Sequence, residues 1–103
     1  MGRNRVIKTL GKRIGNVVLH KLLIKYTNRS ESKIHLESEE IEYRNAAIKD
    51  AKLYHWNSKD KQIIKLQAID FIKDKLIKKY DDINFPLSEA EVLLDKEMKN
   101  LRL

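Results

Sequence analysis

Residues 4–26 read NRVIKTLGKRIGNVVLHKLLIKY, and their apolar side chains recur at three- and four-residue spacing. This period is typical of an amphipathic α-helix, so the stretch predicts one long helix. Gly11 and Gly15 lie four residues apart inside it, and a glycine in a helix costs about 1 kcal/mol relative to alanine. Two glycines on one face allow another backbone to approach closely. The alternative is a break near Gly15 that leaves two short helices.

Residues 59–80 predict a second long helix, which is apolar around much of its circumference. One broad arc is formed by Ile63, Leu66, Ile69, Leu76, Ile77 and Tyr80, and the other side holds Ile64, Ala68 and Phe71. A helix that is apolar nearly all round is buried on more than one side. We therefore expect this helix to be the central helix of a bundle, or to contribute to a dimer interface.

Two more helices are indicated by their first residues. Ser38 is the predicted N-cap of a helix that ends near Tyr54, because three glutamates follow it in the first turn, where carboxylates favour the helix dipole. Ser88 begins the sequence Ser-Glu-Ala-Glu, a capping box with Glu91 at its last position. This pattern predicts a final helix that starts after Ser88.

The segments between these helices are interpreted as loops. Residues 27–38 form the least helical stretch, and Ile34 and Leu36 alternate there with polar neighbours. We predict an ordered loop, with a short strand at residues 33–37 as the alternative. Residues 81–86, DDINFP, predict a turn.

Length and composition favour a helical fold. The chain has 103 residues, with only three glycines and one proline, which suits long helices better than a many-turned β fold. The length is typical of one domain, so residues 1–103 are predicted to form a single helical domain. The expected fold class is all-α, a compact bundle of about four helices. The alternative is an α+β domain with one short strand at residues 33–37.

Several functional classes find no support in the sequence. There is no cysteine, which excludes disulfides, thiolate metal sites and cysteine nucleophiles. The longest apolar runs are three residues, far short of the roughly 20 that a membrane span needs. We therefore expect a cytoplasmic protein with no membrane contact. His20, His35 and His55 show no metal-binding spacing, although convergence of two of them with a carboxylate stays open. The sequence predicts no enzyme activity, no metal and no cofactor.

Charge is distributed unevenly along a chain whose net charge is +7. Residues 1–33 carry nine basic side chains and one acidic side chain, and residues 59–80 carry seven and three. Residues 34–58 and 81–103 are acidic. Two separated basic segments indicate a polyanion or an acidic protein as the partner.

Nucleic acid, either DNA or RNA, is the first expected partner. Lysine and arginine neutralise phosphates and release counterions, which drives binding to any sequence. The predicted binding residues are Arg3, Arg5, Lys8, Lys12, Arg13, Arg29, Lys33, Lys61, Lys65, Lys75 and Lys79. The last four form one ridge when residues 59–80 are projected at 100° per residue. Tyr26, Tyr43 and Trp56 are candidates for stacking on bases, with burial in the core as the favoured alternative.

The alternative to nucleic-acid binding is a protein-interaction module. The broad apolar circumference of residues 59–80 and the small-residue faces at Gly11/Gly15 and Ala47/Ala51 permit close helix contacts within or between chains. On this hypothesis the chain forms a homodimer, or is a small subunit of a complex in which its basic surface meets an acidic partner.

Overall fold

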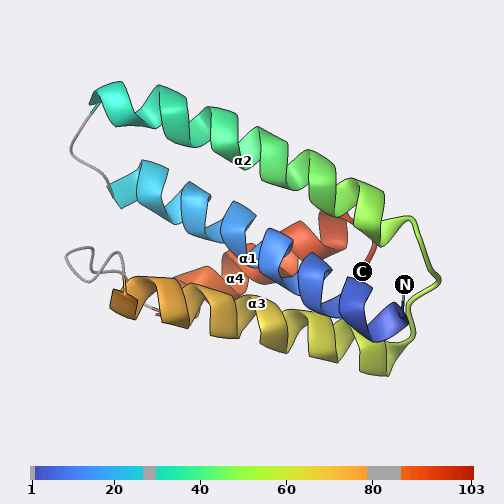
Figure 1. Cartoon of the computed structure of the whole chain (residues 1–103). Coiled ribbons are helices and arrows are strands. Elements are labelled where there is room, and N and C mark those ends of the chain that lie inside the picture. The colour runs from blue at the N-terminus through green and yellow to red at the C-terminus, as the bar shows by residue number, and fades with distance from the viewer. Residues whose placement is uncertain (1, 27–29, 79–86) are drawn as a thin grey trace.

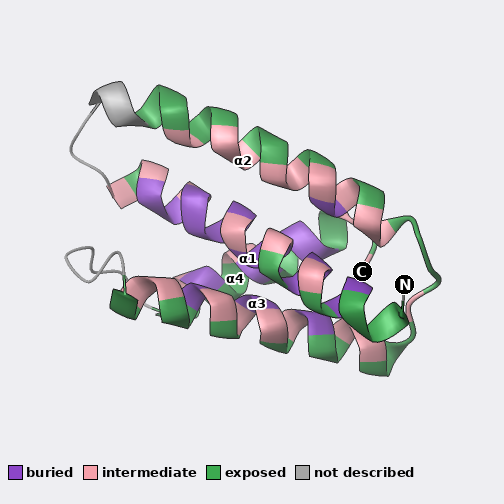
Figure 2. Ribbon diagram, viewed as in Figure 1, coloured by how far each residue is buried: buried purple, intermediate pink, exposed green. Residues whose placement is uncertain are grey.

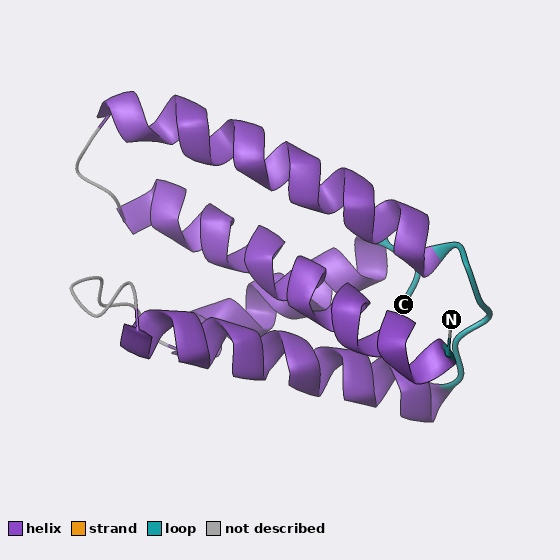
Figure 3. Ribbon diagram, in the orientation of Figure 1, coloured by secondary structure: helices purple, strands orange, loops and turns teal. Residues whose placement is uncertain are grey.

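Residues 2–26, 30–78 and 87–103 are described by a computed structural model, and they contain four helices and no strand (Figure 1). The helices are α1 (Arg3–Tyr26), α2 (Ser30–Ala51), α3 (Ser58–Lys78) and α4 (Leu87–Asn100). They alternate in direction, so the start of α1, the end of α2, the start of α3 and the end of α4 lie at one end of the bundle (Figure 3). The predicted all-α bundle of four helices is confirmed.

The central helix is α1, which packs against each of the other three helices. In Figure 1 it lies between α2 and α3, with α4 behind it. Four consecutive residues, 17–20, are all buried, and at 100° per residue four in a row face every side of a helix. Figure 2 shows this burial along α1. The prediction that residues 59–80 form the central helix is therefore wrong.

Gly11 and Gly15 mark the place where α1 meets α3 most closely. A Cβ added at Gly11 would lie 2.5 Å from the Gln67 Cβ and 2.9 Å from the Ile64 carbonyl oxygen. A Cβ added at Gly15 would lie 2.8 Å from the Ala68 carbonyl oxygen. Because α1 continues unbroken from Arg3 to Tyr26, the two glycines allow close packing and do not break the helix.

Helix α2 begins at Ser30, eight residues before the predicted N-cap Ser38, and ends at Ala51. The predicted loop at residues 30–38 and the alternative strand at 33–37 are both wrong, and residues 27–29 lie outside the described part of the chain. Leu36 is in phase with Ala47 further along one helix face, whereas Ile34 is 76% exposed. The alternation of Ile34 and Leu36 is therefore not a strand pattern, because only Leu36 faces the bundle.

A capping box starts α3. The Asp60 amide donates to the Asn57 side-chain oxygen at 2.8 Å, and the Asn57 amide donates to the Asp60 carboxylate at 3.3 Å. This reciprocal pair satisfies amides that have no partner within the helix. The helix ends at Lys78, and the predicted turn at 81–86 lies outside the described residues.

One apolar arc of α3 faces the core, and the broad arc is divided, because its Ile69 and Leu76 also pack against the core. Ile64, Ala68 and Ile72 are buried, whereas Leu66 and Ile77 are exposed, Ile77 by 77%. This division explains why α3 is not the central helix. An outward apolar arc is also the feature from which an interface was predicted.

Helix α4 begins at Leu87, so Ser88 lies within its first turn and not at the predicted N-cap. Its buried residues complete the core with those of α1 and α3. The buried core residues are Ile7, Leu10, Ile14, Val18, Leu22, Ala47, Ile64, Ala68, Ile72, Ala90, Leu94 and Met98. Among the described side chains of α2, Ala47 is buried in this core and Ala51 is partly buried against it, so α2 lies at the edge of the core.

Candidate nucleic-acid interface

One face of α1 carries basic side chains that are exposed to solvent. Arg5, Lys8 and Lys12 follow one another at spacings of three and four residues, which places them on the same side of the helix. Within the described residues none of them has an acidic partner. We call Arg5, Lys8 and Lys12 the basic face of α1.

Two other predicted binding residues of α1 are paired with carboxylates. Arg3 pairs with Asp60 and also donates to the His55 carbonyl oxygen at 2.7 Å. Arg13 pairs with Asp50, which ties α1 to α2. Their charges hold the bundle together and are partly neutralised there.

Arg3 is also fixed by aromatic rings. Its guanidinium carbon lies 5.7 Å from the ring centroids of both Tyr54 and Trp56. Such contacts stabilise by about 0.5–1 kcal/mol at partly exposed sites. Arg3 therefore joins the start of α1 to the segment between α2 and α3.

The lysines of α3 do not form one free ridge. Lys65 pairs with Asp95 of α4 at 2.8 Å, and Lys75 lies over the Phe71 ring at 5.6 Å. Lys61 lies at the other end of the helix, beside a pocket, and has no acidic partner in the described part of the structure.

The remaining predicted residues are not joined to these. Lys33 is exposed on α2, in a helical segment that was predicted as a loop. Arg29 and Lys79 lie outside the described residues. The predicted set therefore divides into the basic face of α1, the paired cations and scattered single lysines.

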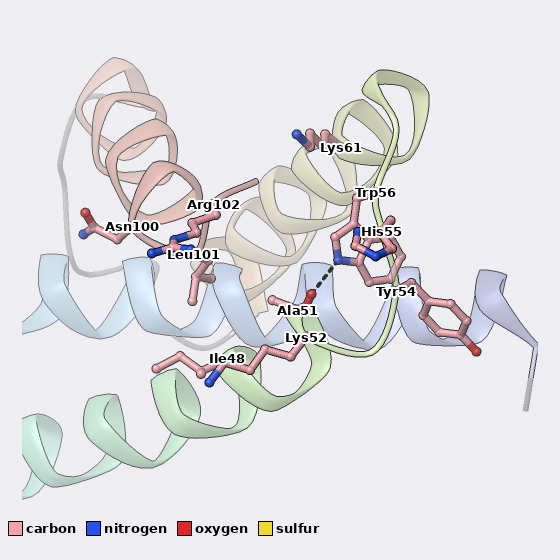
Figure 4. A pocket seen from close by; sticks show the side chains of 10 residues that line it. All are labelled: Ile48, Ala51, Lys52, Tyr54, His55, Trp56, Lys61, Asn100, Leu101 and Arg102. Atoms are coloured by element: carbon pink, nitrogen blue, oxygen red, sulfur yellow. Dashed lines mark hydrogen bonds between the residues drawn. The ribbon is translucent and has the colours of Figure 1, made fainter.

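The fold also gathers basic side chains that are far apart in the sequence. A pocket of about 780 Å³ opens at the end of the bundle where α2 ends, α3 begins and α4 ends (Figure 4). Lys52, His55, Lys61 and Arg102 line it, and no Asp or Glu is among its described lining residues. We call it the basic pocket. The sequence reasoning missed Lys52 and Arg102, because only the alternating directions of the helices bring them together.

Arg102 adopts an unusual backbone conformation beside this pocket. Its φ is 60°, the only positive φ of a non-glycine residue in the described part of the chain. The Leu103 amide donates to the Met98 carbonyl at 2.8 Å, and the Arg102 amide donates to the Lys99 carbonyl at 3.0 Å. These two bonds form a Schellman motif, in which the left-handed position normally favours glycine.

A buried carboxylate lies among cations at the centre of the bundle. Glu97 of α4 is 1% exposed and accepts hydrogen bonds from Arg44 of α2 at 2.8 and 3.3 Å. Lys21 of α1 also donates to Glu97, at 3.2 Å. The Arg44 guanidinium donates in addition to Glu40 at 2.9 Å. Burial alone raises the pKa of Glu97, but the hydrogen bonds from Arg44 and Lys21 outweigh it and hold the pKa below its usual value.

Two histidines converge on one carboxylate, the arrangement that the sequence left open. His20, buried in α1, has its Nε2 2.6 Å from Glu39, and His35 has its Nε2 2.8 Å from the other Glu39 oxygen. The His20 Nδ1 lies 2.8 Å from the Asn16 carbonyl oxygen. The bond from His20 lowers the pKa of Glu39. Both ring nitrogens of His20 thus face oxygen acceptors.

Both histidines of this pair bind Glu39 through their Nε2 atoms. In the described part of the chain no three His, Asp or Glu side chains are grouped as ligands of a metal ion would be. Two of the aromatic candidates for base stacking are packed inward: Tyr26 lies against the core, and Tyr43 lies 5.3 Å from the His20 ring. Trp56 lies partly against the core and also lines the basic pocket.

None of the helices in residues 2–26, 30–78 and 87–103 combines the length and apolar character of a membrane-crossing segment. No protein-family model matches the chain, and no curated protein and no solved structure matches it.

Proposed function

We propose that this chain is a non-enzymatic protein that binds nucleic acid through phosphate contacts made by Arg5, Lys8 and Lys12. The observation that carries the proposal is the exposure of these three cations on one helix face without an acidic partner. From Arg5 to Lys12 the helix rises about 10 Å, at about 1.5 Å per residue. That span covers about three phosphates of one strand along the axis of a DNA duplex.

The basic face differs from the other cations that the sequence suggested. Arg3, Arg13 and Lys65 hold carboxylates, and releasing them would cost contacts within the bundle. Arg5, Lys8 and Lys12 lose no such contact when a phosphate approaches. Their side chains are therefore available for binding without rearrangement of the fold.

Fluorescence anisotropy with labelled single- and double-stranded DNA and RNA tests the proposal. We expect binding that weakens with salt, because counterions are released. Reversing both lysines, Lys8→Glu with Lys12→Glu, should weaken binding to all sequences and flatten the log–log salt slope by about two. The matched control is Lys73→Glu with Lys96→Glu, which changes the net charge equally at two exposed lysines elsewhere.

Equal losses in the two double variants would mean that binding follows net charge alone, and the assignment to α1 would be wrong. No binding by the unmodified chain at low salt would reject nucleic-acid binding itself.

A second candidate function is a protein-interaction module, and the outward apolar arc of α3 favours it. Leu66 is 59% exposed and Ile77 is 77% exposed. On this proposal, Leu66→Glu leaves the fold intact but dissociates an oligomer seen by light scattering. A monomer at micromolar concentration would reject the homodimer form of this proposal.

A further inference from the structure

We propose that the basic pocket binds an organic phosphate with a flat apolar body, the chemistry of a nucleoside monophosphate. This ligand site is separate from the basic face of α1 and does not depend on nucleic-acid binding. The pocket volume of about 780 Å³ lies within the range of about 300–1,000 Å³ that is typical of small-molecule sites.

The charge of the pocket selects for an anion. Lys52, His55, Lys61 and Arg102 reach it from three different segments of the chain (Figure 4). None of these side chains is paired with a carboxylate within the described residues, although many cations elsewhere in the bundle are. The positive charges of Lys52, Lys61 and Arg102 line one pocket without an acid, and a phosphate would offset their mutual repulsion with charge-assisted hydrogen bonds.

The pocket also offers an apolar surface against which the flat body of the ligand can pack. Ile48, Ala51, Trp56 and Leu101 line the same pocket. The Trp56 indole is held in place, because its Nε1 donates to the Ala51 carbonyl oxygen at 2.8 Å. The pocket is therefore lined by apolar and polar side chains together, and the polar groups would fix the orientation of the ligand.

The backbone at Arg102 adds an independent indication. A glycine would suit the left-handed position that ends α4, and a side chain there costs stability. The residue present instead is an arginine whose side chain lines the pocket (Figure 4). Strained backbone that places a functional group of this kind is characteristic of ligand sites.

Trp56 is the only tryptophan of the chain, so its fluorescence reports on the pocket directly. We expect adenosine 5′-monophosphate to change this fluorescence saturably, with calorimetry giving the same affinity. Adenosine, which lacks the phosphate, should bind at least about tenfold more weakly.

The Arg102→Gly variant distinguishes an effect on ligand binding from an effect on stability. It should raise or preserve the melting temperature, because glycine suits the left-handed position, and it should weaken adenosine monophosphate binding by about tenfold. Lys61→Gln should weaken binding similarly. The control Lys96→Gln removes one exposed lysine of α4 that does not line the pocket, and should leave binding unchanged.

Two results would overturn the proposal. One is the absence of a saturable signal with adenosine monophosphate up to millimolar concentration. The other is unchanged affinity in both Arg102→Gly and Lys61→Gln. The Lys8→Glu, Lys12→Glu double variant should bind the nucleotide normally, so failure of the pocket and failure of the nucleic-acid interface are distinguishable.

Discussion

The Arg44 guanidinium of α2 donates to both carboxylate oxygens of Glu97 in α4, at 2.8 and 3.3 Å. The backbones of these two helices are not in direct contact. The pair therefore joins α2 to α4 through side chains alone, and Lys21 of the central helix binds the same carboxylate. A buried charge of this kind is tolerated only when it is fully hydrogen-bonded, and no described buried side-chain polar atom lacks a partner.

Replacing this carboxylate by its amide should destabilise the bundle. Glu97→Gln preserves the side-chain volume but removes the charge that Arg44 and Lys21 share, and we expect a loss of about 2 kcal/mol in the free energy of unfolding. Urea denaturation measures it. Glu91→Gln, at an exposed glutamate of the same helix, is the control and should change stability by less than about 0.5 kcal/mol. Equal stability of the two variants would show that the buried pair contributes nothing.

Stability should fall on the acid side because of Glu97 and Glu39. The pKa of each carboxyl is lower in the folded chain than in the unfolded chain. The unfolded chain therefore binds more protons, and the stabilisation is complete above the ordinary glutamate pKa of about 4.3. It is lost as the pH falls through the lower, folded pKa values. The free energy of unfolding measured from neutral to acid pH should show this decline.

The same experiment on Glu97→Gln isolates the contribution of one group. The variant lacks the titrating carboxyl, so its stability should decline less steeply with acid than that of the unmodified chain. Parallel curves would assign the acid sensitivity to other carboxyls.

The contact of α1 with α3 should not accept even one methyl group. Alanine is the better helix former by about 1 kcal/mol, but a Cβ at Gly11 or Gly15 would meet the α3 backbone within 3 Å. We expect Gly11→Ala and Gly15→Ala each to lower the free energy of unfolding by about 1–2 kcal/mol. Gly2→Ala is the control, because nothing lies within 4 Å of its added Cβ. A stabilised Gly11→Ala variant would mean that the helices separate easily.

Local sequence signals were sufficient for three of the four helices. The period of residues 4–26 and the apolar character of residues 59–80 predicted α1 and α3, and the capping-box pattern at Ser88 predicted the start of α4 to within two residues. The start of α2 was predicted wrongly, since the strand-like alternation of Ile34 and Leu36 obscured a helix in which only Leu36 faces the bundle. Its early turns are polar and contain no buried apolar residue to reveal the period.

The arrangement of the helices could not be read in the same way. Both apolar arcs of residues 59–80 look equally suited to a core, and only packing shows that Leu66 and Ile77 face outward while Ile69 and Leu76 of the same arc pack against the core. The sequence identified the basic residues of α1, but it could not show which of them are paired with acidic residues. The partners of Arg13 and Arg3 are Asp50 and Asp60, which lie 37 and 57 positions away in the sequence. The basic pocket was missed for the same reason.

Helix α2 should be the first part of the bundle to open. Among its described side chains only Ala47 is buried, and its other links to α1 and α4 include the ion pairs of Asp50, Glu39 and Arg44. Opening α2 therefore exposes little apolar surface compared with opening α1. In native-state hydrogen exchange, we expect the amides of α2 to exchange faster than those of α1. Glu97→Gln should speed exchange in α2 at least about tenfold, with a smaller effect in α1.

A core substitution provides the contrast for this measurement. Leu94→Ala removes a fully buried side chain of α4, which lowers the stability of the whole bundle by about 2–5 kcal/mol. The most protected amides of α1 open with the whole bundle, so their exchange should accelerate most in Leu94→Ala, whereas Glu97→Gln should act mainly on α2. If both variants accelerate exchange equally in the two helices, then α2 does not open as a separate unit, and its ion pairs belong to a single cooperative structure.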